Sequence, residues 1–494
     1  MPQLLDHRGR PLTVSQRQAN RRVLKASYDA AQTTDENKNH WAWADGYNAN
    51  ASNDPETRKV IRERARLEAA NNCYAAGTLD TLSNDIVGTG PRLQLSIPGV
   101  SREQSRAVER LWSLWAEQVR FANDLRINVK TKKRDGELIG LMVTNRNLDP
   151  FLPQLALKFY EPEQLSTPNL FRYAYDPRQQ DGVRFDEYGN PTEYHLLKFH
   201  PGSDFGWMNQ FQHETFSSAQ ILHWFRADRP GQARGISELM PALPLFAQLR
   251  RFTLAVIAAA ENGANIAGVL ETDQSADGEN STGGVAPFDR VEIERAALMT
   301  LPGKWKMHGF DSTQPQSTYD MFVTRLLIEI GRAMNTPYEV ISGDSSRSNY
   351  SSSRLMYSIY HRSVRVERRS LESAVLRKVF FAWLREAFAM GILPQGLPPI
   401  VRWVVSWYWD GFDSIDPFKE ANANSVLLES NQTTLAELYA EAGQDWEEQL
   451  EQRALELRRM AELGISQDQS MPNAPLTPQQ LADAQQQLED AANA

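Results

Sequence analysis

The stretch DPETRKVIRERARLEAANNCYAAGTLDTLSNDIVGTGPRLQ, residues 54–94, carries the clearest local signals in the chain. Asp54 is a good helix N-cap, and the proline after it favours the same start. The residues that follow predict a helix that continues to about Val87, with a break near Asn71 and Asn72. Gly88 then ends the helix, because glycine readily adopts the left-handed conformation of a helix C-terminus.

Helical periodicity recurs on both sides of that stretch. Further helices are expected over residues 101–118, 235–265, 318–334, 352–390 and 417–463. In the first of these, Leu111, Leu114 and Trp115 fall on one face. A helix-rich chain is therefore expected, and its remaining segments decide the fold class.

From about Arg126 to His223 short apolar or alternating runs are separated by turn residues, which predicts a mostly β lobe. The basic run 126–134 at its start has five positive residues and no acid, and we expect a solvated loop there. Other short strands are expected near residues 298–301, 305–308 and 401–409. The Gly- and Ser-rich stretch 272–287 predicts a mobile loop, and the Gln-rich end a disordered tail.

Composition limits the classes of function. The 494 residues are long for one core, so two to four lobes are expected. The net charge of −9 argues against a protein that grips DNA over its whole surface, although it permits a wall that DNA slides past. No apolar run approaches the ~20 residues of a membrane span, and no secretory signal is visible, so the chain is expected in the cytoplasm of the cell that makes it.

Motifs for catalysis and for cofactors are missing. There is no G-x-x-x-x-G-K-[ST], no strand-anchored G-x-G-x-x-G, no G-x-S-x-G and no H-E-x-x-H. The single cysteine, Cys73, excludes an intrachain disulfide and a cysteine metal site, and a buried, inert thiol is expected. We therefore expect no catalytic residue, no metal and no cofactor.

Two groups of residues keep a second interpretation open. Asp410, Asp413 and Asp416 recur every three residues, and clustered carboxylates could hold metal ions in a DNA-processing nuclease of a mobile element. Turns and helix caps explain the same spacing better. Similarly, Trp403, Trp407 and Trp409 could stack on bases, but core or interface packing is favoured.

The segment 343–378 is basic, with eight Arg or Lys and three acids. On the helix expected there, Arg362, Arg365 and Arg369 lie on one face, with Arg368 beside it. This face is either simply solvated or placed beside an anionic partner or a neighbouring subunit, and the sequence does not decide between the two.

Four motifs in order resemble the lambda family of phage portal proteins. The first is the Arg-rich helix of 54–94 with Asn-Asn-x-Tyr-Ala-Ala-Gly and Val-Gly-Thr-Gly. The second is ILHWFRADRPGQARGISELMPAL, 221–243, which resembles the family's Arg-Pro-Gly-Gln-x-Arg-Gly run. The third is Asn-Tyr-Ser-Ser at 349–352 after a Gly-Asp loop. The fourth is DPFKEANAN, 416–424, with Gly-Gln-Asp-Trp-Glu-Glu at 443–448 downstream.

The resemblance implies an α+β portal fold that assembles as a dodecameric ring. The implied parts are an N-terminal wing-associated helical region (1–125), a β-rich wing (126–234), a first stem helix (235–265), a small α/β clip (266–317), a second stem helix (318–342), a channel loop (343–353), a long wing helix and strand (354–415), an α-helical crown (416–463) and a disordered tail (464–494).

The resemblance also implies a function and partners. The ring would sit at one capsid vertex of the virion as head-tail connector, after procapsid assembly in the host cytoplasm, and pass double-stranded DNA during genome packaging and ejection. Its partners would be itself, the terminase large subunit, major capsid and scaffold proteins, and head-completion or tail proteins, with no membrane.

Candidate site residues follow from this plan and from the side chains. Short polar residues and one arginine suit a loop that touches a moving duplex, so the DNA-facing candidates are Ser345, Ser346, Arg347, Ser348 and Asn349. For Arg347 the alternatives are a helix cap or a pair with Asp344. Candidates for the ring interface are Arg250, Arg251, Arg362, Arg365 and Arg369; of the first two, which are adjacent, only one can share the packing face of Leu249.

Overall fold

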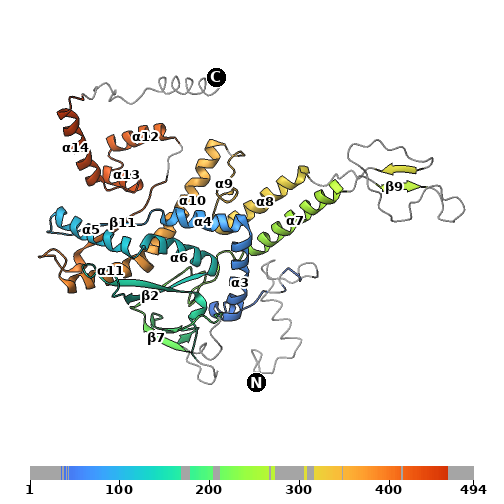
Figure 1. Cartoon of the computed structure of the whole chain (residues 1–494), viewed down its shortest axis with the longest axis horizontal. Coiled ribbons are helices and arrows are strands. Elements are labelled where there is room, and N and C mark those ends of the chain that lie inside the picture. The colour runs from blue at the N-terminus through green and yellow to red at the C-terminus, as the bar shows by residue number, and fades with distance from the viewer. Residues whose placement is uncertain are drawn as a thin grey trace, which may run out of the picture. The chain divides into compact units, whose positions relative to one another are not determined.

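The computed structural model describes residues 35, 38–40, 42, 44–168, 178–203, 212–265, 269–272, 305–308, 316–347, 349–412 and 416–465. The chain divides into two units, Met1–Ser52 and Asn53–Ala494. The described part of the first unit contains the short helix α2 (Ala49–Ser52). The elements below all belong to the second unit, which combines helices with antiparallel sheets, as the α+β expectation requires (Figure 1).

The helix predicted after Asp54 is present and breaks where expected. Helix α3 (Pro55–Asn71) starts with the Asp54 carboxylate accepting from the backbone N–H groups of the first turn. Asn72 ends α3 and caps α4 (Cys73–Val87), which stops at Gly88 with φ 59°. Cys73 is exposed, contrary to the expectation, because it is the first residue of α4, whose core-facing side chains begin at Ala75.

Two helices follow, and the second corrects the sequence interpretation. Helix α5 (Arg102–Gln118) begins with the Ser101 capping box, but it buries Trp112 beside Trp115 and leaves Leu114 exposed. Helix α6 (Phe121–Asp135) occupies the place expected for a solvated loop and the start of the β lobe.

The sequence pattern did not indicate α6 because one of the residues on its buried face is a lysine. Leu125, Val129 and Lys132 occupy one side at helical spacing and are all buried. A buried lysine reads as a surface residue in a sequence pattern, so the periodicity was obscured.

The strands of the β lobe begin after α6. One antiparallel sheet has the order β3-β2-β8 and a second the order β4-β5-β6-β7. The elements are β2 (Glu137–Thr144), β3 (Leu155–Tyr160), η2 (Pro162–Gln164), β4 (Gln179–Gln180), β5 (Val183–Phe185), β6 (Pro191–Leu197), β7 (His213–Ser217) and β8 (Ile221–Phe225). The β lobe predicted between Arg126 and His223 is therefore confirmed from Glu137 on.

A helical hairpin follows the β lobe. Helix α7 (Leu243–Asn265) and helix α8 (Gln316–Met334) lie side by side (Figure 1), joined by the stacking of Phe252 on Tyr319 with ring centroids 5.6 Å apart. The first helix was expected to begin at Gly235. It begins eight residues later, because prolines at 241 and 244 disfavour helix just before them.

The segment between these helices is described only in part. Strands β9 (Val269–Thr272) and β10 (Trp305–His308) pair in antiparallel fashion. The strand expected near 298–301 and the loop 272–287, apart from Thr272, lie outside the described residues. After α8, the short helix α9 (Tyr338–Ser342) leads into the Gly343 loop.

The predicted long helix is present with one irregularity. It consists of α10 (Tyr350–Leu371), a π-helical turn η4 (Glu372–Leu376) and α11 (Arg377–Met390), and Gly391 ends it. The chain continues through η5 (Ile400–Arg402), β11 (Val404–Tyr408), α12 (Pro417–Glu429), α13 (Leu435–Glu441) and α14 (Trp446–Glu462). The expected tail lies outside the described residues from 466 on.

The largest core joins α4, α5, α6, α10 and α11 to a two-stranded sheet of β11 and β1 (Arg92–Ser96). Trp112 lies at its centre, with ring centroids 4.7 Å from Trp115 and 5.5 Å from Trp407. Trp403 and Trp409 are buried in the same core. Trp407 of β11 and the flanking Trp403 and Trp409 therefore serve packing, as favoured from the sequence.

Candidate functional site

The Arg-rich helix α3 turns a row of arginines toward the sheets. Arg58, Arg62 and Arg66 are four residues apart and so share one helix face. Arg62 donates to a carboxylate oxygen of Glu137 at 3.1 Å, and Arg66 donates twice to Asp135, each time at 3.1 Å. The helix is thereby fastened to the end of α6 and the start of β2.

Glu137 is the centre of this cluster and has no exposed surface. Arg234 donates to it from Nη2 at 2.6 Å, the backbone N–H of Gly235 at 3.0 Å, and His223 Nε2 at 3.0 Å. Burial alone would raise the pKa of Glu137, but the charge of Arg234 and the hydrogen bond from His223 hold it well below the usual value.

The contacts of Arg234 and Gly235 show why the motif Arg-Pro-Gly-Gln-x-Arg-Gly ends in these two residues. Its guanidinium donates to the carbonyl oxygens of Leu165 at 2.8 Å and Pro162 at 2.9 Å. The next residue, Gly235, packs against Gly136, and a Cβ on Gly235 would lie 2.2 Å from the Gly136 carbonyl oxygen. Glycine is needed there because two backbones touch.

A second buried cluster joins α6 to α10. The ammonium groups of Lys132 and Lys133 each contact both Glu238 and Glu367, at distances between 2.6 and 3.0 Å. Burial would raise the pKa of Glu238, but Lys133 and Lys132 lower it to about 2. These four residues were absent from the sequence predictions, since the lysines were placed on a solvated loop.

Neither cluster resembles an acid–base site. Glu137 and Glu238 are each held ionised by at least two cations, so they do not exchange protons near neutral pH. His223 donates from Nε2 to Glu137, and burial lowers its pKa, so the ring stays neutral. The clusters anchor helices to sheets and offer no activated nucleophile.

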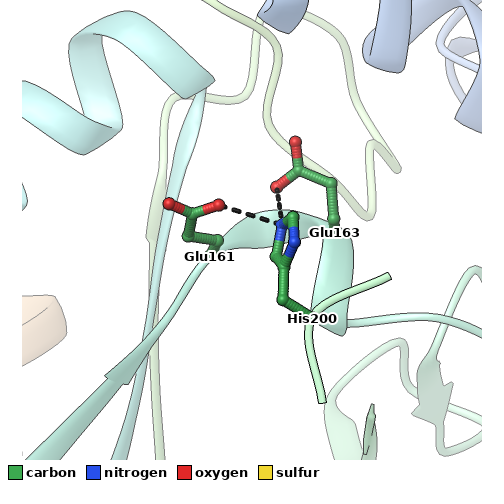
Figure 2. Close-up of side chains that lie close together, drawn as sticks. All are labelled: Glu161, Glu163 and His200. Carbon is green, nitrogen blue, oxygen red and sulfur yellow. Dashed lines mark ion pairs between the residues drawn. The ribbon is translucent and has the colours of Figure 1, made fainter. Parts of the chain in front are cut away.

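One group of side chains has the composition of a metal site. His200 Nε2 lies 2.9 Å from Glu161 and 3.8 Å from Glu163 (Figure 2). However, His200 Nδ1 accepts from the Gly202 N–H at 3.0 Å, which leaves Nε2 protonated and unable to bind a metal. Arg66 also contacts both glutamates. The group therefore fits an ion-pair cluster better than a cation site.

The carboxylates of the nuclease hypothesis have other roles. Asp410 accepts from the Thr89 hydroxyl at 2.8 Å and from Arg92 at 2.9 Å, and so fixes the Val-Gly-Thr-Gly turn. Asp416 caps α12 by accepting from the Lys419 N–H at 3.1 Å. Asp413 lies outside the described residues. The turn and cap interpretation is confirmed for the two that are described.

The predicted channel loop is held by local contacts. Arg347 pairs with Asp320 of α8, so the expected alternative of a pair with Asp344 is wrong. Asp344 instead accepts from the Ser346 N–H at 2.9 Å, and Asn349 caps α10 by accepting from Ser352 at 2.9 Å. Ser345 and Ser346 are exposed. Ser348 lies outside the described residues.

The two adjacent arginines of α7 point in different directions, as expected. Arg250 pairs with Glu68 of α3 at 3.0 Å, whereas Arg251 is exposed. By length and mean hydropathy, Leu243–Glu261 is apolar enough to cross a membrane, contrary to the expectation that no apolar run approaches a membrane span, and only 17% of it is buried. Most of this helix surface is therefore uncovered in a single copy.

The arginine row of α10 is also on the surface. Arg362, Arg365 and Arg369 are all exposed, and the latter two pair with Glu441 at 3.7 Å and Glu372 at 2.8 Å. Arg368 beside them is buried and donates to the carbonyl oxygens of residues 85 and 86. The row is thus solvated within one copy, which leaves both alternatives for it open.

Comparison with known proteins decides the family. The model of "Phage portal protein, lambda family" matches residues 35–368, which is more than half of the chain. The chain belongs to the lambda family of phage portal proteins. The match contains both charge clusters, the α7–α8 hairpin and most of α10, and it ends before the aspartates of the nuclease hypothesis.

Individual portal proteins are similar over most of their length. The probable portal protein of Halomonas phage phiHAP-1 is 23% identical over 82% of each chain, and portal protein B of Escherichia phage lambda is 23% identical over 80% of this chain and 83% of its own. The portal protein of Escherichia phage N15 is 24% identical, with 80% and 83% covered.

Solved structures were also found. A chain of the virion of a native gene transfer agent particle has a TM-score of 0.46 at 15% identity and covers 79% of this chain and 99% of its own. An HK97-family phage portal protein from Corynebacterium diphtheriae has a TM-score of 0.28 at 10% identity, with 59% and 82% covered.

Proposed function

We propose that this phage portal protein forms a ring, of twelve copies as the family resemblance implies, at one capsid vertex of the virion. Double-stranded DNA passes through the ring during packaging and ejection. The observation that supports this best is the lambda-family match over residues 35–368, whose motifs form the buried anchor around Glu137. The role is structural, and no residue is assigned to catalysis.

The portal role brings a set of partners. The ring nucleates the procapsid in the host cytoplasm with capsid and scaffold proteins, docks the terminase large subunit, and later holds head-completion or tail proteins. We assign the β lobe to the wing, α7 and α8 to the stem, the segment between them to the clip, and α12–α14 to the crown.

Size in solution and activity test this function together. The purified protein should form a closed ring of about twelve copies by light scattering and electron microscopy, and it should not cut DNA with Mg²⁺ or Mn²⁺. A monomer at all concentrations would contradict the ring. Cleavage that disappears in Asp410→Ala would revive the nuclease hypothesis, for which no observation speaks at present.

The channel loop is the second part of the proposal. Arg347 is 44% exposed, and one such arginine per copy gives the ring a band of positive charge that attracts phosphates without regard to sequence. Asp320 keeps the side chain at a fixed place on α8. Ser345, Ser346 and Asn349 add weak polar contacts to the same surface.

A packaging assay tests the channel loop. Arg347→Glu should leave the ring assembled but reduce the DNA content of packaged heads, because a ring of carboxylates repels the duplex. Arg146→Glu, an exposed loop position of the β lobe, is the matched control. Normal DNA content at all salt concentrations would remove Arg347 from the channel.

A further inference from the structure

The three C-terminal helices are attached to the rest of the chain with very little burial. Of residues 416–465, which contain α12, α13 and α14, only Gly443 is buried. No side chain of this segment belongs to a hydrophobic core of the described residues, and Leu450, Leu455 and Leu457 of α14 are exposed. We call residues 416–465 the C-terminal unit. Apolar burial contributes little to its attachment, since that contribution grows with the area removed from water.

The turn between α13 and α14 is the one point where the C-terminal unit packs tightly. Gly443 in this turn has φ 73°, and a Cβ there would lie 2.3 Å from the carbonyl oxygen of Trp409. A Cβ on Gly411 would lie 2.6 Å from the carbonyl oxygen of Glu441. Two backbone segments touch here, so a side chain at position 443 would push the turn away from the strand exit.

Beside this turn, one arginine of α5 holds three carboxylates. The guanidinium of Arg102 contacts Glu109 of its own helix at 2.9 Å, Glu447 of α14 at 2.7 Å, and also Asp445. Two of the three carboxylates belong to the C-terminal unit, and the third belongs to α5. Arg102 is therefore the cation that joins the two parts.

Further polar contacts extend this attachment along α14. Asp445 is the N-cap of α14, accepting from the Glu447 N–H at 3.0 Å, and it also accepts from the side chain of Gln94 at 2.7 Å. One helical turn beyond Arg102, Arg106 pairs with Glu451 at 2.6 Å. The same spacing of four residues thus separates the two cations on α5 and the two glutamates on α14.

We propose that the C-terminal unit docks on α5 through Arg102 and can leave α5 while its helices stay folded, so that the charge at Arg102 controls docking. Without this guanidinium, the three carboxylates face one another unpaired and repel. The helices keep the bonds that form them, because Asp416, Thr434 and Asp445 cap α12, α13 and α14 from within the unit. The inference concerns a single copy and does not depend on the ring.

The exposure of the pairs shows which contact dominates. The side chains of Asp445 and Arg102 are 12% and 26% exposed, so salt screens this pair only in part. Glu451 is 62% exposed, and Arg365 and Glu441, which are 3.7 Å apart, are 62% and 61% exposed. Exposed pairs of this kind contribute little. Substitution of Arg102 should therefore release the unit more completely than salt does.

Crosslinking within one chain tests the docking. In a Cys73→Ser background, Arg106→Cys and Glu451→Cys place one thiol on each side of the contact and leave Arg102 in place. A short bismaleimide should join them, with the crosslinked peptide pair identified by mass spectrometry. Adding Arg102→Ala should slow this reaction about tenfold, because hydrogen bonds between charged groups are lost. Gly443→Ala should slow it similarly without changing a charge, and about 1 M NaCl should slow it less.

The matched control removes an ion pair elsewhere. Arg184→Ala, which loses the exposed pair with Glu193 in the β lobe, should crosslink at the rate of the parent. Far-UV circular dichroism of Arg102→Ala should retain the helical signal of the parent. An unchanged crosslinking rate in Arg102→Ala would overturn the proposal. A loss of helical signal would also overturn it, since the unit would then unfold instead of leaving, and so would crosslinks that join different chains.

Discussion

The cluster around Glu137 and the α7–α8 hairpin solve opposite problems. In the cluster, arginines and carboxylates are buried, and each carboxylate is held by several donors from within the chain. On the hairpin, Leu254 and Met321 remain exposed although they are apolar. The first region is complete in a single copy, whereas the second leaves large apolar side chains uncovered in that copy.

The difference separates residues that stabilise the fold from residues that remain candidates for the proposed assembly. A buried charge must be paired within the chain, since an unpaired one is very costly. Exposed apolar side chains such as Leu254 cost little in a monomer but add stability once a partner covers them. Mutations in the two regions should therefore separate unfolding from loss of assembly.

The largest effect is expected in the charge cluster. Glu137→Gln leaves the positive charges of Arg62 and Arg234 buried without their counter-ion, which should cost about 3–5 kcal/mol of unfolding free energy. Soluble yield and the urea unfolding midpoint measure this. The matched control is Glu161→Gln, whose side chain is 52% exposed and whose loss should cost at most about 1 kcal/mol. Equal midpoints for the two variants would remove Glu137 from its central position.

A pair of leucines on α7 sharpens the comparison within a single helix. Leu249 is 3% exposed and lies in the core with α3 and α8, so Leu249→Ala should cost about 2–5 kcal/mol of folding stability. Leu254→Ala should change the stability of a monomeric sample by no more than about 0.5 kcal/mol and instead reduce ring formation. A large loss of monomer stability in Leu254→Ala would show that Leu254 is covered within the chain.

Acid should weaken the charge clusters and leave the apolar packing between α7 and α8 intact. The pKa of Glu238 is lowered from 4.5 to about 2, so its stabilisation of about 3 kcal/mol is present above pH 4.5 and is lost as the pH falls toward 2. His223 acts in the same direction at higher pH, because burial lowers its pKa from 6.5 and the unfolded chain takes up the proton first. Unfolding midpoints should therefore fall below about pH 6.5, and His223→Gln should flatten the first part of that fall. A constant midpoint down to pH 3 would contradict both assignments.

The sequence predicted local structure well where a single residue determines it. Asp54 and Gly88 bound the helix pair as expected, and Asp416 caps α12, because caps depend on one side chain and its nearest backbone. The family motifs also contain the Arg-rich helix α3 and Arg234, which the structure joins through Glu137. The buried position of those arginines was not foreseen, although their spacing of four residues gives one face and could have suggested it.

The missed features depend on contacts between distant residues. Lys132 and Lys133 looked like a solvated loop, and only the carboxylates of Glu238 and Glu367, more than a hundred residues away, make their burial possible. Asp320 could not be chosen as the partner of Arg347 either, because α9 and its flanking turns bring the two together.

The smallest effect on folding is expected for the arginine row of α10, which consists of Arg362, Arg365 and Arg369. Arg365 is 62% exposed and only 3.7 Å from an equally exposed Glu441, and surface pairs of this kind contribute about 0–1 kcal/mol. Arg365→Ala should therefore leave the unfolding free energy of the monomer within about 0.5 kcal/mol of the wild type.

The effect of Arg365→Ala on assembly, measured by light scattering across a range of salt, separates the two alternatives for the row. If Arg362, Arg365 and Arg369 contact acids of the next copy, the triple alanine variant should assemble at higher protein concentration and lose the salt dependence of the wild type. Unchanged assembly would make the row a solvated face.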